Sequence, residues 1–167
     1  GVGALYKKKG LRLSPYVLGG GQEGNFRSGT EGTPAIFSFA AACEAGAATL
    51  KADIAHEKTL LNDLAEKISA LEGIVINGCH EAPHILSLSI PGVPTQNTIN
   101  ILQDHGICVS AGSACAKGHR SHVMTAMNLS PEVIDGSFRV SICRDTTQEE
   151  LDRLAEIIEK DILPRAR

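Results

Sequence analysis

Cys115 has the clearest capacity for nucleophilic chemistry in this chain. It lies in VSAGSACAKGHRSHV, residues 109–123, where very small residues precede it, so we expect an accessible thiol. Lys117, His119 and Arg120 place positive charge nearby, and cations stabilise the thiolate, which is the nucleophilic form of cysteine. The segment alone is equally compatible with a loop cysteine that has no role, because many cysteines are inert.

The same segment offers a metal site as a second interpretation. Cys115, His119 and His122 could supply three ligands. Zinc sites usually have a fourth ligand at a recognisable spacing, and none follows before the distant Cys143. A weaker set, more typical of a solvated loop, consists of Cys79, His80 and His84. We therefore expect no metal site.

The elements that must position this segment alternate between strands and helices. Thr33 and Pro34 predict a helix start, with an N-cap and a first-turn proline. A second helical stretch over residues 61–71 is ended by Gly73, and the last helix begins with a capping box at residues 147–150. Further helices are expected at residues 95–105 and 122–127, with a single helical turn from Ser130-Pro131. Strands are expected at residues 2–6, 74–76, 85–90, 107–109 and 138–142.

Composition limits the fold and the function classes. With 167 residues, 43% of them hydrophobic and 21% charged, the chain can bury one good core. The alternating elements predict an α/β or α+β domain, a small sheet covered by helices. The 16 basic and 19 acidic residues give a net charge of −3, so nothing indicates a nucleic-acid or membrane partner.

Targeting features are absent from the sequence pattern. No apolar run approaches the roughly 18 residues of a membrane span, and the first residues, GVGALYKKKG, do not form a signal peptide. The five scattered cysteines form no CxxC pair, which favours a reducing, cytoplasmic location and buried cysteine side chains. Because Gly1 is not Met and opens directly into an apolar stretch, we expect the numbering to begin within a longer protein.

Four segments in a fixed order carry further information. They are GVGALY at the start, GGGQEGNFRSGTEGTP at 19–34, SAGSACAKGHRSHVMTAMNLS at 110–130 and SFRVSICRDTTQEELD at 137–152. Together they resemble the cysteine desulfurases, in the class V aminotransferase branch of pyridoxal-phosphate enzymes. The resemblance implies the C-terminal part of a fold-type I enzyme, with residues 1–32 as the tail of the large cofactor domain. Residues 33–167 would then form the small C-terminal domain.

The resemblance also implies roles for three residues. Cys115 matches the catalytic cysteine, which takes sulfur from L-cysteine and becomes a persulfide, leaving L-alanine. Arg139 matches the arginine that binds the substrate carboxylate, a task suited to its paired donors and permanent charge. Thr30 matches the residue that contacts the cofactor phosphate of the other subunit in a homodimer. Arg27 in the same segment is expected to hold that loop or the phosphate region, without a catalytic role.

One departure from the family limits what this chain should do alone. The Schiff-base lysine of these enzymes follows a histidine and lies a few residues before a segment like GVGALY, so it is expected before Gly1. The run of Lys7, Lys8 and Lys9 lies on the wrong side of that segment. We therefore expect the chain alone to be inactive and the longer protein to bind pyridoxal phosphate.

The expected function is that of a cysteine desulfurase fragment. The parent enzyme would supply sulfur for iron–sulfur cluster assembly, through a scaffold protein, or to another acceptor. Two alternatives remain open. The parent could be a selenocysteine lyase, or the chain could be a stand-alone module that carries persulfide or binds a partner without the cofactor.

Overall fold

The computed structural model describes residues 1–79, 81–111 and 120–166. Its described residues form two compact units, Gly1–Leu50 and Lys51–Arg167. The division falls inside the long helix α2 (Thr33–Ser69), whereas the sequence placed a boundary near residue 33. The assignment of residues 1–32 and 33–167 to two domains stays a prediction.

The first unit contains loop and helix only. A distorted turn, α1 (Gln22–Asn25), includes Glu23 and Gly24 in the left-handed region and precedes the first part of α2. The strand predicted at residues 2–6 was wrong, because this segment has no strand structure. An extended segment becomes a strand only when a neighbour satisfies its backbone hydrogen bonds, and Gly1–Leu50 provides no other strand.

Helix α2 runs without interruption from Thr33 to Ser69. The start predicted at Thr33 is confirmed, but the two helical stretches expected before residue 73 form one helix. No proline follows Pro34 within the helix and Gly46 is its only glycine, so no residue type breaks it. Its last part, from Leu60 to Ile68, buries an apolar stripe in the second unit.

The second unit is built on a small antiparallel sheet. Its strand order is β1 (Val75–Ile76), β2 (Ile85–Ser89), β4 (Ser137–Ser141) and β3 (Ser110–Ala111). The expected mixed α/β class is therefore confirmed, with β2 and β4 as the paired centre. The strand predicted at residues 107–109 was misplaced. Within the described part of this stretch, Ser110 and Ala111 pair with β4, whereas residues 107–109 have no strand structure and line a hollow of about 410 Å³ together with residues 140–142.

Capped helices connect these strands. Helix α3 (Thr95–Asp104) follows β2, and α4 (His122–Ala126) and α5 (Pro131–Asp135) precede β4. The side chains of Ser121 and Ser130 cap α4 and α5. Helix α6 (Gln148–Ile157) begins with the predicted capping box between Thr147 and Glu150. It continues as a π-helix (Ile158–Ile162) and a 3-10 turn (Leu163–Arg165).

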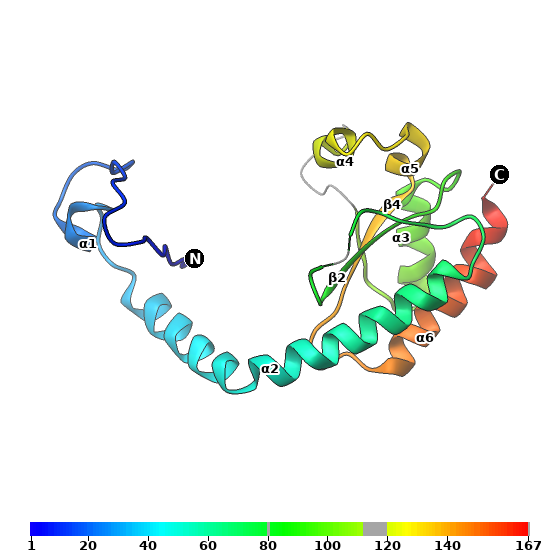
Figure 1. The fold of residues 1–167 in the computed structure, drawn as a ribbon, viewed down its shortest axis with the longest axis horizontal. Coiled ribbons are helices and arrows are strands. Elements are labelled where there is room, and N and C mark those ends of the chain that lie inside the picture. Colours follow the sequence, from blue (N-terminus) through cyan, green and yellow to red (C-terminus); the bar gives the residue numbers. More distant parts are fainter. Residues whose placement is uncertain (80, 112–119, 167) are drawn as a thin grey trace. The chain divides into compact units, whose positions relative to one another are not determined.

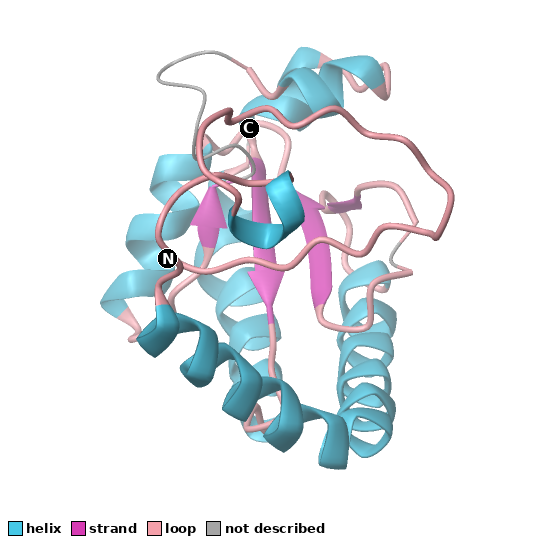
Figure 2. Ribbon diagram, turned by 90° about the vertical axis from the view of Figure 1, so that its left-hand side faces the viewer, coloured by secondary structure: helices cyan, strands magenta, loops and turns pink. Residues whose placement is uncertain are grey.

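The core lies on one face of the sheet. Leu86, Leu88, Phe138 and Val140 point to the helices and are almost fully buried. Helices α2, α3 and α6 and the π-helix after α6 supply the opposing side chains, among them Leu64, Leu102, Leu154 and Ile158. Figure 1 shows α4 and α5 at the end of the strands away from α6, and Figure 2 shows helices behind the strands. None of the helices described is both long and apolar enough to cross a bilayer.

Candidate functional site

Arg139 lies on the sheet face opposite the core. Its neighbours Phe138 and Val140 are buried, whereas Arg139 itself is exposed, as alternation along a strand requires. Arg139 pairs with Ser87 on β2 and with Ser110 on β3. Directly opposite residues share a face and have their Cβ atoms about 4.5–5.5 Å apart. The arginine is therefore flanked by a serine on each side.

Asn77 extends this row of polar residues. Its backbone N–H donates to the carbonyl oxygen of Ser87 at 2.8 Å. Its side-chain Nδ2 donates to the Oγ atoms of Ser87 at 3.2 Å and Ser89 at 2.8 Å. We call Asn77, Ser87, Arg139 and Ser110 the polar row. It runs from Asn77, the residue after β1, across β2 and β4 to β3, in a sheet whose other face is apolar.

The guanidinium of Arg139 has no protein partner in the described part of the chain. None of the ion pairs or side-chain hydrogen bonds found there includes Arg139. Five donors in a planar fork, flanked by hydroxyl groups, suit a carboxylate or phosphate. The sequence-predicted carboxylate role of Arg139 is thus compatible with its position, and it stays a prediction.

Cys115 lies outside the described residues, together with Lys117 and His119. The described residues on both sides of it are held beside the start of β4. On one side Ala111 pairs with Phe138. On the other, Arg120 donates from Nε and Nη2 to the two carboxylate oxygens of Asp135, at 2.7 and 2.6 Å. The polar row therefore ends at Ser110, where the chain leads into the segment that contains Cys115.

Asp135 forms an ion pair with Arg120. Their bidentate hydrogen bond raises the pKa of the Arg120 guanidinium and lowers the pKa of the Asp135 carboxyl from their ordinary values. The sequence suggested that Arg120 helps to stabilise a Cys115 thiolate. In the described residues Arg120 is paired with Asp135. Because Cys115 lies outside those residues, the effect of Arg120 on its thiol stays a prediction.

Thr30 follows a tightly bonded turn in the first unit. Ser28 is buried and donates from Oγ to the carbonyl of Gly20 at 2.7 Å, and Gly29, with φ +125°, donates from its N–H to Gln22 Oε1 at 3.2 Å. Arg27 donates to the carbonyl oxygen of Ser28, which agrees with a loop-holding role. Thr30 is exposed, with no side-chain hydrogen bond inside the described ranges. A free hydroxyl on a fixed turn suits a phosphate oxygen.

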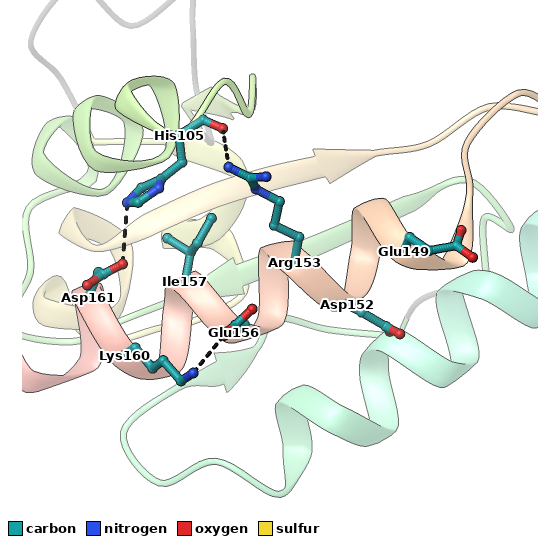
Figure 3. A pocket seen from close by; sticks show the side chains of 8 residues that line it. All are labelled: His105, Glu149, Asp152, Arg153, Glu156, Ile157, Lys160 and Asp161. Atoms are coloured by element: carbon teal, nitrogen blue, oxygen red, sulfur yellow. Dashed lines mark hydrogen bonds and ion pairs between the residues drawn. The ribbon is translucent and has the colours of Figure 1, made fainter.

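A different hollow of about 500 Å³ lies beside α6, and three interactions join residues that line it (Figure 3). His105 Nε2 lies 3.3 Å from Asp161 Oδ2, and Lys160 Nζ lies 2.6 Å from Glu156 Oε1. Arg153 donates from Nη2 to the carbonyl oxygen of His105 at 3.4 Å. None of the residues predicted to bind substrate or cofactor lines it. We therefore do not take it as the candidate site.

The prediction of buried cysteines was wrong. The four described cysteines are free and exposed, because leucine, isoleucine, valine and phenylalanine fill the core; they are Cys43, Cys79, Cys108 and Cys143. Of the metal alternatives, Cys115, His119 and His80 lie outside the described residues. Across residues 1–79, 81–111 and 120–166, no three His, Cys, Asp or Glu side chains are grouped to hold a metal.

Comparison with known proteins identifies the family. The model of the class-V aminotransferases matches residues 1–154. The chain belongs to this family. It is 34% identical, over its whole length, to a cysteine desulfurase of Nostoc sp., and 36% identical over 97% of its length to a mitochondrial cysteine desulfurase of Arabidopsis thaliana. A solved NifS-like protein shares 32% identity and superimposes with a TM-score of 0.76 over 93% of this chain.

This class-V chain spans less than half of the relatives it matches. It covers 43% of the Nostoc protein, 37% of the Arabidopsis protein and 40% of the NifS-like structure. The resemblance to the cysteine desulfurases is confirmed, and so is the shared fold.

Sequence reasoning missed Asn77 and Ser87. A signal was present, because Ser87 and Ser89 alternate with Leu86, Leu88 and Ile90. That alternation predicts a polar face on β2. It does not identify the residue opposite, because register between strands distant in the chain is set by the folded sheet.

Proposed function

We propose that the protein containing this chain is a pyridoxal-phosphate-dependent cysteine desulfurase. It converts L-cysteine to L-alanine and delivers the sulfur, as a persulfide on Cys115, to an acceptor such as an iron–sulfur scaffold protein. The observation that carries the proposal is Arg139, which has no partner among the described residues and is flanked by Ser87 and Ser110 where the chain leads toward Cys115. Family membership and the names of the relatives support the same reaction.

Two of the described residues have the chemistry to bind the cofactor phosphate and the substrate carboxylate. Thr30 offers a free hydroxyl for the cofactor phosphate, and we assign it to the site of the partner subunit in a cytoplasmic homodimer. Arg139 offers its fork to the substrate carboxylate. Bound pyridoxal phosphate supplies the electron sink that lets the carbon–sulfur bond of cysteine break.

We assign the lysine that binds the cofactor to a position before Gly1. Lys7, Lys8 and Lys9 are exposed, and Lys7 Nζ donates to the carbonyl oxygen of Leu11 at 3.1 Å. A lysine that forms a covalent bond with a cofactor is made reactive by a surrounding pocket, and these three do not have the surroundings of such a group.

The chain's own residues divide the work as follows. Arg139 holds the substrate carboxylate and fixes which end of cysteine faces Cys115. The Cys115 thiolate attacks the substrate sulfur. A sulfur–sulfur bond forms as the carbon–sulfur bond breaks, and the three-carbon remainder keeps that electron pair, gains protons and leaves as alanine. The persulfide sulfur then passes to an acceptor thiolate, which returns Cys115 to its thiolate form.

The test uses the full-length protein with Cys115→Ala. We expect no sulfide or alanine from L-cysteine, while the visible absorbance of bound cofactor is retained, because the cofactor lysine lies elsewhere. Cys108→Ala is the matched control, since Cys108 is exposed and lies just before β3, the strand that leads into the Cys115 segment. It should keep near-normal turnover. Near-normal sulfide release from Cys115→Ala would overturn the proposal, and parallel assays with selenocysteine would show whether that substrate is preferred.

A further inference from the structure

The hydroxyl group of Ser87 accepts one hydrogen bond from a described neighbour. Asn77 Nδ2 donates to Ser87 Oγ at 3.2 Å, so one oxygen lone pair of the serine is occupied. Nowhere in the described ranges does the Ser87 hydroxyl donate its own hydrogen to an acceptor. Arg139, its direct cross-strand neighbour, carries donors only and cannot accept that hydrogen. The open face beside Arg139 therefore presents a further free O–H donor.

Asn77 is itself incompletely paired. It is only 8% exposed, and its Oδ1 atom is buried with no hydrogen-bond partner in the described structure. Its Nδ2 is committed to both Ser87 and Ser89, and Ser89 is fully buried. Buried polar groups are almost always satisfied. The Asn77 amide is thus fixed between the hydroxyl groups of Ser87 and Ser89, and its Oδ1 is left to accept from a donor outside the described residues.

We propose that Ser87 is a substrate-binding residue that donates a hydrogen bond to the carboxylate held by Arg139, and that Asn77 is the positioning residue that orients it. The inference rests on the proposed function and names a further contact of the same site. A carboxylate has about four lone-pair sites and an arginine fork fills two of them. The remaining sites need donors. Of the two serines opposite Arg139, Ser87 and Ser110, Ser87 is the one whose hydroxyl is oriented by a described neighbour, Asn77.

Loss of the Ser87 hydroxyl is predicted to affect substrate binding more than the chemical step. The substrate carboxylate keeps its charge throughout the reaction, so its contacts stabilise the ground state and the transition state alike. A hydrogen bond to a charged group is worth roughly ten- to hundredfold in affinity. Losing Ser87 should therefore raise KM by about that factor and leave kcat within about threefold.

The experiment measures L-alanine binding to the full-length holoenzyme by calorimetry, because this product carries the carboxylate but no sulfur. We expect Ser87→Ala to bind L-alanine roughly ten- to hundredfold more weakly, and Ser87→Thr, which keeps the hydroxyl, to restore most of the affinity. Ser141→Ala is the matched control, since Ser141 is an exposed serine on the same strand and face as Arg139. It should bind as the unmodified protein does.

Asn77→Ala completes a double-mutant cycle. If Asn77 acts through Ser87, the double variant should bind L-alanine about as weakly as Ser87→Ala alone, not more weakly. Binding by Ser87→Ala within about threefold of the unmodified protein overturns the inference, as does failure of Ser87→Thr to rescue. These outcomes do not depend on sulfur transfer, so a Cys115→Ala variant that still releases sulfide would sink the proposed function and leave the Ser87 result standing.

Discussion

Ser110 lies directly opposite Arg139 in the β3–β4 pair. The residue predicted to bind a carboxylate and the last strand before the Cys115 segment are therefore joined by backbone pairing. In a sheet, such pairing fixes the spacing of the two strands at about 5 Å. A carboxylate bound by Arg139, as proposed, would thus lie beside the point where the chain leads into the segment that contains the predicted nucleophile, Cys115.

Replacing Arg139 with leucine should weaken the use of L-cysteine in the full-length protein. Loss of a bidentate, charge-assisted contact is expected to lower kcat/KM by roughly tenfold or more. Steady-state kinetics measure this. Arg144→Leu is the control, because Arg144 is an exposed arginine in the same sequence motif, residues 137–152. Its Nε atom lies 3.9 Å from Oδ1 of Asp145. A decrease of less than about threefold for Arg139→Leu would remove its assigned role.

The chain expressed alone should not turn over L-cysteine when pyridoxal phosphate is added. Catalysis requires an amine held against the cofactor within a pocket, and Lys7 to Lys9 are exposed. They should react with free cofactor only at substoichiometric levels. Assays of alanine and sulfide on the purified chain check this. Turnover that disappears in Cys115→Ala would show that the chain holds a complete site.

Gly136→Ala should destabilise the second unit strongly. A Cβ atom at this position would lie 2.2 Å from the carbonyl oxygen of Ile90, which is backbone and cannot move aside. Forced overlap of this kind typically costs about 1–3 kcal/mol or more. Urea unfolding followed by circular dichroism measures the loss. Gly46→Ala is the matched control, because its Cβ meets nothing within 4 Å and it lies in α2; an unchanged midpoint for Gly136→Ala would contradict the geometry.

Asp135→Asn should lower thermal stability slightly near neutral pH and have no effect in strong acid. The hydrogen bond from Arg120 lowers the pKa of the folded-state carboxyl. Its contribution is therefore present above the unfolded pKa, about 3.9, and is lost as the pH falls through the lowered folded-state value. Melting temperatures at about pH 7 and about pH 2.5 check the sign. Glu132→Gln, on the same helix, is the control, and a larger effect in acid would refute the assignment.

Local signals in the sequence predicted the helices of the second unit well. The capping box of Thr147 and Glu150 and the proline after Ser130 act within one helical turn, so their neighbours in sequence are their partners in space. The continuous helix α2 was divided wrongly because the apolar stripe from Leu60 to Ile68 stands out against an exposed first half. Packing against the sheet, not helix propensity, produces that contrast.

Predictions that depended on strand partners were less successful. Residues 2–6 have strand-forming side chains but no partner in their unit, and residues 107–109 lie across a cavity from residues 140–142. The candidate site shows the same division. Arg139 was identifiable from its motif, whereas Asn77 joined it only through pairing of strands β1, β2 and β4.

The two described ends of the Cys115 segment are attached at positions close to each other in the sequence, Ala111 to Phe138 on β4 and Arg120 to Asp135 at the end of α5, two residues before β4. Residues can therefore be added to or removed from the span between them without changing either attachment. In general, doubling the length of a loop between two fixed ends costs only about 0.6 kcal/mol. Insertions or deletions between these two attachments would thus leave the strand and Arg139 where they are, so the segment that contains Cys115 can change in length independently of the sheet.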